Sequence, residues 1–273
     1  MARNMYDTDV TTWSPQGRVH QIEYAKEAVK QGSAVVGLVS KDFALLGAVR
    51  RAASELAEHQ QKLFRIDDHM GIGISGLVGD ARVLCQFMRE EALNHKYVYG
   101  TPIDTQRLVT QISDQAQIYT QTSERRPYGV GLLVIGYDEV TGPRLFETCP
   151  SAVHYQYFAQ AIGARSQSAK TYLERNYETF PDTGLDDLIL HVLRALKAAS
   201  PNNKLSPQGT SVAFVGKDSK FTRLTGDSLQ KYLSQIPDDE RIVEDVPEPA
   251  PEPIDEDVPP EIAEDDSAPR ELL

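Results

Sequence analysis

The sequence predicts an α+β fold in which antiparallel sheets are covered by layers of helices. Two observations favour this class. Runs of β-prone residues follow one another across short turns, and pairs of amphipathic helical segments separate these groups of strands. A parallel sheet would instead need single helices alternating with single strands. At 273 residues, the chain is long enough to bury a sizeable core.

A tight turn followed by a short helix is the most complete local signal near the start of the chain. Ser14, Pro15 and Gly17 occupy positions i, i+1 and i+3 of a type I turn. We expect a helix from Arg18 to Lys30, with Gly32 as the residue that ends it. Its stripe consists of Val19, Ile22, Ala25 or Lys26, and Val29, at three- and four-residue spacing.

The first half of the chain then predicts one hairpin, two further short strands and two helices. Residues 1–13, ahead of the turn, show no sustained periodicity, and we expect them to form a mobile arm. The predicted strands are Ala34–Val39, Phe43–Val49, Leu63–Ile66 and Met70–Ser75. A helix with apolar positions from Ala81 to Ala92 follows, and a second one, Asp104–Tyr119, should lie antiparallel to it.

Strand signals return in the second half of the chain. Strands are expected at Val130–Tyr137, Arg144–Thr148 and about Val153–Ala159, and at Ser211–Val215 and Phe221–Leu224 near the end. Between them we expect one helix within Ala164–Tyr177 and one whose apolar stripe runs from Leu185 to Leu196. A short helix from Asp227 closes the predicted domain of residues 14–236.

Charge separates the last 37 residues from the rest. Residues 237–273 hold 15 acidic and 2 basic side chains, so their net charge is −13, whereas the whole chain has −12. Half of the 16 prolines also lie there. Such a segment has too little apolar surface to offset the entropy of ordering it, and we expect a disordered acidic tail, most simply a solvated spacer.

Composition also bears on compartment and partners. The two cysteines, Cys85 and Cys149, fit neither a disulfide framework nor a metal quartet, and the first ten residues lack the apolar core of a secretory signal. We therefore expect an intracellular, reducing compartment. The longest apolar run, near Gly129 to Gly136, is too short for a bilayer, and the acidic balance disfavours a nucleic-acid partner.

The N-terminal region resembles the signature of proteasome α subunits, whose pattern runs YD, SPxGR, QxEYA and AVxxG. The segments RRPYGVGLLVIGYD from Arg125 and IGARSQSAKTYLER from Ile162 extend the resemblance over most of residues 5–235. Thr8 departs from it, because many members carry arginine there. The matching residues are Tyr6, Asp7, Ser14, Pro15, Gly17, Arg18, Gln21, Glu23, Tyr24, Ala25, Ala28, Val29 and Gly32.

The resemblance implies a fold, a function and partners. The fold would be the four-layer αββα sandwich of N-terminal nucleophile hydrolases, with two antiparallel sheets and an extra N-terminal helix. The function would be that of a noncatalytic subunit in a seven-membered α ring of the 20S core particle. Its partners would be other α subunits, β subunits, and the regulatory particle or other activators of ubiquitin- and ATP-dependent degradation. No cofactor or metal is implied, and the location would be cytoplasm and nucleus.

The resemblance also implies two sites. The residues that match the family's gate cluster, which holds the N-terminal arms open, are Tyr6, Asp7, Pro15 and Tyr24. The residue that matches the lysine of the pocket for activator tails is Lys62, and an ammonium on a flexible stem suits a terminal carboxylate.

An active hydrolase of the same fold is the alternative function. Such enzymes release a hydroxyl-bearing residue after a glycine and use its α-amine as the base, and Ser33 follows Gly32 here. Lys62 also falls where the active members carry a lysine. However, Val49 stands where the acidic partner is expected, and an uncleaved helix leaves Ser33 with an amide nitrogen. We therefore expect an inactive Ser33.

Three other features favour structural roles. Gly71, Gly73 and Gly76 spell GxGxxG, but they lie within a predicted strand, so close backbone packing is the better interpretation than dinucleotide binding. The 6 histidines show no spacing typical of a metal site. A third hypothesis, a free-standing adaptor that binds through the acidic tail, would require a chain that stays monomeric.

Overall fold

The computed structural model describes residues 6–54, 56–200 and 204–236. It divides the chain into two units, Met1–Glu240 and Arg241–Leu273. The predicted acidic tail of residues 237–273 lies outside the described residues, as do the first five residues of the predicted arm. Within the described part, no helix is both long and apolar enough to cross a membrane.

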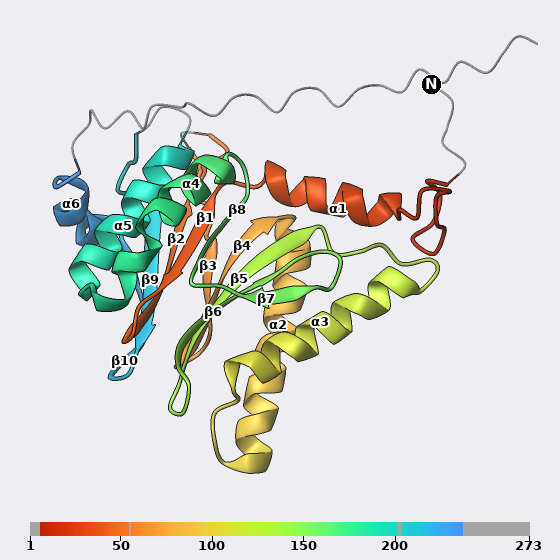
Figure 1. The fold of residues 1–273 in the computed structure, drawn as a ribbon, viewed down its shortest axis with the longest axis horizontal. Coiled ribbons are helices and arrows are strands. Elements are labelled where there is room, and N and C mark those ends of the chain that lie inside the picture. The colour runs from red at the N-terminus through yellow and green to blue at the C-terminus, as the bar shows by residue number, and fades with distance from the viewer. Residues whose placement is uncertain (1–5, 55, 201–203, 237–273) are drawn as a thin grey trace, which may run out of the picture. The chain divides into compact units, whose positions relative to one another are not determined.

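Two five-stranded antiparallel sheets form the centre of the first unit (Figure 1). One, here called sheet A, has the order β10-β9-β2-β1-β8, and the other, sheet B, has the order β3-β4-β5-β6-β7. The strands are β1 Val35–Val39, β2 Phe43–Val49, β3 Leu63–Asp67, β4 Met70–Gly76, β5 Val130–Asp138, β6 Gly142–Thr148, β7 His154–Gln156, β8 Ala159–Ile162, β9 Thr210–Gly216 and β10 Ser219–Thr225.

Helices cover the outer face of each sheet, so the expected αββα sandwich is confirmed (Figure 1). Sheet B packs its outer face on α2 and α3, and sheet A packs its outer face on α4 and α5. The helices are α1 His20–Gln31, α2 Val78–Tyr99, α3 Thr105–Gln121, α4 Ser166–Asn176, α5 Leu185–Ala199 and α6 Asp227–Leu233, with the 3₁₀ helix η1 Tyr177–Asp182 after α4.

Three clusters of buried apolar residues make up the core, one under each helix layer and one between the sheets. The cluster between the sheets is built from side chains such as Leu46 and Leu133, which are fully buried. Glycines let the layers approach here. A Cβ on Gly73 would lie 2.6 Å from a Val35 methyl group, and one on Gly71 would lie 2.0 Å from the Phe221 ring. The interpretation of the GxGxxG motif as close backbone packing is confirmed.

The predicted turn at Ser14 forms, but the helix after it begins later than expected. The Gly17 N–H donates to the Ser14 carbonyl at 2.9 Å, and Gly17 has the positive φ of 75° that favours glycine. Ser14 also binds Arg18 through two hydrogen bonds, so Arg18 belongs to the turn. As a result, α1 starts at His20.

The end of α1 also differs from the expectation in conformation. Gly32 follows the helix, but its φ of −66° and ψ of 150° are extended and not left-handed. A glycine is needed there for a different reason: a Cβ on Gly32 would lie 2.3 Å from Ser75 Oγ and 2.4 Å from the Gly76 nitrogen. Close packing against β4, and not a left-handed cap, therefore requires this residue.

The single strand expected at about Val153–Ala159 is wrong, because the chain changes sheets within it. Residues 154–156 form β7 at the edge of sheet B, and residues 159–162 form β8 at the edge of sheet A. Tyr157 and Phe158 make the crossing. An edge strand shows the same alternation of side chains whichever sheet it joins, so the sequence pattern alone does not reveal the change of partner.

Candidate functional site

Ser33 lies at the junction of α1 and β1, beneath the end of the helix. Only 7% of the residue is exposed. Its hydroxyl donates to the carbonyl oxygen of Val49 at 2.7 Å, and Lys62 Nζ lies 2.7 Å from the same hydroxyl oxygen. Lys62 also donates to the carbonyl oxygen of Ser33. The structure thus brings together the serine and the lysine that the sequence singled out.

The peptide bond before Ser33 is tightly enclosed. The Gly32 carbonyl accepts a hydrogen bond from the Ala164 N–H at 2.7 Å. Gly163, next to it, has a φ of 96°, and a Cβ there would lie 2.8 Å from both the Gly32 and the Ser33 carbonyl oxygens. In the continuous chain, the nitrogen of Ser33 is an amide, so it offers no basic amine at this position.

The Lys62 side chain is buried, with 5% of the residue exposed. Burial and the nearby Arg51 guanidinium lower the pKa of Lys62 to about 7. Such a lysine can exchange a proton near neutral pH. However, the proton of the Ser33 hydroxyl is directed at Val49 and not at Lys62, and Val49 provides only a backbone oxygen where a carboxylate would be needed.

A second cluster joins the N-terminal arm to α1. Tyr24 donates its hydroxyl proton to Asp7 Oδ2 at 3.0 Å, and Gln21 Nε2 donates to the Asp7 carbonyl oxygen at 2.7 Å. The Asp7 contact raises the pKa of Tyr24. Tyr24 also stacks on His20, with ring centroids 6.3 Å apart. Two turns of the helix therefore hold one residue of the arm.

Only part of the predicted gate cluster is joined by hydrogen bonds in the single chain. Asp7 and Tyr24 meet, as described above. Tyr6 is half-buried and Pro15 is exposed in the turn, and among the described residues neither makes a hydrogen bond with Asp7 or Tyr24. The role of the four residues as a gate stays a prediction.

One ion pair, between a largely buried aspartate and an exposed arginine, was missed by the sequence reasoning. Asp80, in the first turn of α2, accepts two hydrogen bonds from Arg126, at 2.6 and 2.8 Å, and one from the Gly129 N–H at 2.8 Å. The Arg126 contact lowers the pKa of Asp80. This pair ties α2 to the segment before β5. The only available signal was the acidic residue in the first turn of a predicted helix, which is too common to identify a partner.

Metal chemistry finds no support in the described part of the chain, where no group of three or more histidine, cysteine, aspartate or glutamate side chains could hold an ion. The histidines instead make structural contacts. His154 Nδ1 lies 2.7 Å from Ser113 Oγ, and His191 Nδ1 lies 2.9 Å from the Tyr172 hydroxyl.

Comparison with known proteins identifies two family models in the chain. Residues 29–215 match the model of the proteasome subunit family, and residues 6–28 match the N-terminal signature of A-type proteasome subunits. The second match includes the turn, most of α1 and the Asp7 contact described above.

Curated relatives extend over nearly the whole chain. A probable alpha type-6 proteasome subunit of Schizosaccharomyces pombe is 52% identical over 87% of this chain and 88% of its own length. The alpha type-1 proteasome subunit of Dictyostelium discoideum is 50% identical over 89% of this chain and 98% of its own length. The alpha type-1 subunit of Trypanosoma brucei rhodesiense is 43% identical over 97% of this chain and its full length, 100%. The segments from Arg125 and Ile162 predict a subunit like type 1, also numbered α6, and these alpha type-1 and type-6 relatives confirm that prediction.

Proposed function

The chain belongs to the proteasome subunit family and carries its A-type N-terminal signature, and from this premise we propose how its own residues serve a proteasome α subunit. It is a noncatalytic α subunit that assembles with other subunits of the core particle. Ubiquitin- and ATP-dependent degradation is the process that this membership implies. The roles proposed below concern ring assembly, the gate and the docking of activators.

The absence of catalysis is supported above all by the surroundings of the Ser33 hydroxyl. Its proton is donated to Val49, and its backbone nitrogen is an amide in the continuous chain. Ser33→Ala in the assembled particle should leave every peptidase specificity unchanged, measured with one fluorogenic peptide for each. If one specificity were lost while assembly stayed intact, the alternative of an active Ser33 would have to be accepted.

The arm before α1 is proposed to take part in closing the pore. Asp7 is held by Tyr24 and Gln21, so it can anchor the arm at a defined point of the helix. Deleting residues 2–10 should raise basal peptide hydrolysis by the particle. An unchanged rate would mean that the arms of other subunits carry the closure.

Partners are proposed at the level of the ring. We expect a seven-membered α ring, contact with β subunits, and α1 at the contact with neighbouring α subunits. Some charged side chains of α1 form ion pairs with nearby residues of the same segment. Glu23 pairs with Arg18 at 2.6 Å, and Glu27 pairs with Lys30 at 2.9 Å. Lys26 has no ion pair among the described residues, so it is the charge most available to a neighbour. Native mass spectrometry of the endogenous complex tests the ring.

Lys62 is proposed to meet the terminal carboxylate of an activator tail. The Lys62 ammonium is buried and already donates hydrogen bonds to the hydroxyl and carbonyl oxygens of Ser33. The carboxylate must therefore compete with these two oxygens for the ammonium. Because the pKa of the free Lys62 is about 7 and the bound form needs the ammonium, tail affinity should fall as pH rises from 6 to 8.

The test is the binding of a single tail peptide to the particle. Lys62→Ala should weaken it by roughly 1.5 to 3 kcal/mol, the range for a hydrogen bond to a charged group, and should abolish the pH dependence. Equal affinity and an equal pH profile for both proteins would remove the assignment.

We also propose a location in cytoplasm and nucleus, which the resemblance to proteasome α subunits implies. Imaging of the tagged endogenous chain tests this proposal.

A further inference from the structure

The crossover between the two sheets leaves both of them with an open edge on the same side of the molecule. β7 ends the order of sheet B, β8 ends the order of sheet A, and Tyr157 and Phe158 connect them. The opposite edges are joined to each other, because the Phe221 N–H of β10 donates to the Asp68 carbonyl beside β3 at 2.6 Å. Unpaired strand edges therefore gather in the segment 154–162.

The hydrogen-bond alternation shows which backbone groups face outward. Tyr157 N–H donates to β6 at 2.9 Å, and the Phe158 carbonyl accepts from β1 at 2.9 Å. Because alternate residues of an antiparallel strand face its partner, Gln156 and Ala159 turn their N–H and C=O groups away from the sheets. Ala161 N–H also points outward, but the Gln160 side chain already accepts its hydrogen bond at 2.9 Å.

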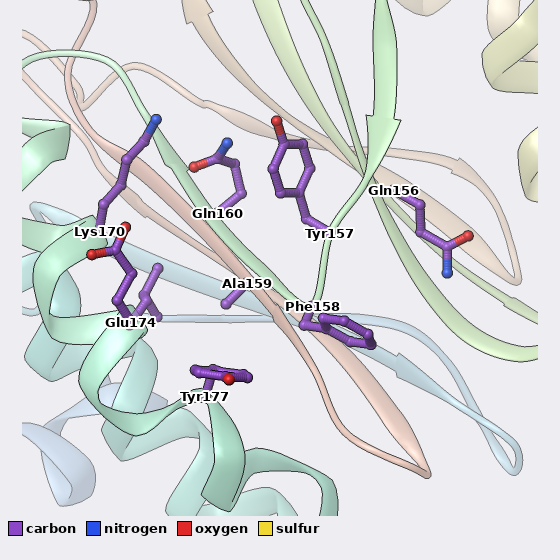
Figure 2. Close-up of a pocket in the computed structure, with 9 residues that line it drawn as sticks. Gln156, Tyr157, Phe158, Ala159, Gln160, Lys170, Glu174 and Tyr177 are labelled. Carbon is purple, nitrogen blue, oxygen red and sulfur yellow. The ribbon is translucent and has the colours of Figure 1, made fainter.

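A pocket of about 340 Å³ lies directly beside these outward groups. Figure 2 shows the side chains that line this pocket, Tyr157 and Phe158 from the crossover, and Lys170, Glu174 and Tyr177 from α4 and η1. Two aromatic rings are strongly exposed, since Phe158 is 75% and Tyr177 46% accessible to solvent. An aromatic wall beside an open strand edge suits the apolar side chain of an added strand.

A second pocket of about 330 Å³ continues the first, because Tyr157 and Lys170 line both. It adds two cations from α1, Lys26 and Lys30. In the part of the chain that the structure describes, Lys170 makes no ion pair. The acidic side chain in this pocket, Glu147, accepts a hydrogen bond from Gln160 at 2.7 Å. This end of the surface is therefore suited to a carboxylate.

We propose that the two pockets form one groove that binds an extended segment of another polypeptide chain. The segment adds as a strand to the outward groups of Ala159 on β8 and, across a bulge at the crossing, to those of Gln156 on β7, because the two residues are an odd number of positions apart. It places an apolar side chain beside Phe158 and Tyr177 and directs an acidic side chain to Lys170. Backbone pairing supplies the affinity and the two side-chain positions supply the specificity. The groove is distinct from Lys62, which is buried, binds Ser33 and lines neither pocket.

Hydrogen exchange of the full-length chain, alone and in the assembled particle, tests the strand addition. The amides of Gln156 and Ala159 should exchange at least 100-fold more slowly in the particle, whereas the Ala161 amide, already bonded, should change much less. Equal exchange of the outward amides in both forms would overturn the proposal.

Crosslinking tests the chemistry of the occupant. A benzoylphenylalanine in place of Phe158 should, in the particle, crosslink to one extended stretch that has an acidic residue within about four positions of the crosslinked site, because neighbouring residues of a strand lie ~3.3 Å apart. Crosslinks to a helix, or scattered over several chains, would contradict the proposal.

Two further variants make the test specific. Lys170→Glu should lower the yield of the crosslink at least fivefold, and Ala159→Pro should do the same, because proline removes the outward N–H while leaving the pairing with β1. Lys96→Glu, at an exposed position of α2, is the matched control and should leave the yield unchanged. If Lys170→Glu also left it unchanged, the carboxylate position would be wrong.

Discussion

Replacing Lys62 with methionine should stabilise the isolated chain at acidic pH, and the gain should disappear as pH rises. Burial and Arg51 lower the pKa of this lysine from 10.5 to about 7. Below pH 7 the native and unfolded states both carry the charge, and the native state bears its full desolvation cost. Between pH 7 and 10.5 only the unfolded state binds the proton, so stability rises with pH.

The size of the effect follows from the two pKa values. At ~1.4 kcal/mol for each pH unit between them, the cost of the buried charge is about 5 kcal/mol at pH 6 and about 2 kcal/mol at pH 9. Methionine has a similar volume but loses two hydrogen bonds to Ser33, at about 1 kcal/mol each. The variant should therefore be more stable than the wild type by about 3 kcal/mol at pH 6, and nearly equal to it at pH 9.

Urea unfolding at pH 6, 7.5 and 9 measures this difference. Far-UV circular dichroism is the suitable signal, because the single tryptophan, Trp13, is 67% exposed and changes little on unfolding. Lys96→Met, at an exposed site of α2, is the control and should follow the wild type at every pH. If Lys62→Met differed from the wild type by the same amount at pH 6 and pH 9, Lys62 would not be desolvated as described.

Three further predictions concern other parts of the chain. Gly32→Ala should lower the free energy of unfolding by about 2 to 3 kcal/mol, because its Cβ meets β4 backbone, and a value below about 0.5 would contradict that packing. Asp80→Asn should cost about 2 kcal/mol at pH 7. Because the folded pKa of Asp80 is lowered, the stabilisation is present above the unfolded pKa of about 4 and is lost as pH falls through the lower folded pKa, so the difference between the two proteins in urea unfolding should narrow as pH falls below 4. Tyr24→Phe, which removes only the hydroxyl that binds Asp7, should leave urea unfolding unchanged and lower activator-stimulated peptide hydrolysis severalfold, and full stimulation would argue against the gate cluster.

Much of the fold was predictable because its elements carry strong local patterns. The stripe from Leu185 to Leu196 appears as α5, and the hairpin around Ser40 appears as β1 and β2. The crossing at Tyr157 and Phe158 was not predictable, because an edge strand shows the same alternation whichever sheet it joins. The stacking of the two sheets came from the family resemblance, since periodicity alone indicates only α plus β.

Part of the candidate site was also predictable from the sequence, and part was not. Position in the family pattern pointed to Ser33, Lys62, Asp7 and Tyr24, and the structure brings them together as two hydrogen-bonded pairs. The burial of Lys62 was not predictable, because a single lysine that follows the polar residues HQQ is usually exposed. Its hydrogen-bond partner, Ser33, lies 29 positions away in the chain, between α1 and β1.

The order of the strands also has a consequence for how the chain folds. Sheet B consists of consecutive strands, β3 to β7, and can form from a continuous stretch of chain. Sheet A joins β1 and β2 from the beginning to β8, β9 and β10 from the end. During synthesis the early hairpin must therefore wait for partners made more than 100 residues later, with its apolar faces unprotected. We expect pulse-labelled hydrogen exchange during refolding to show that the amides of β4 and β5 become protected before those of β1. The strand that follows Ser33 would then be among the last to form.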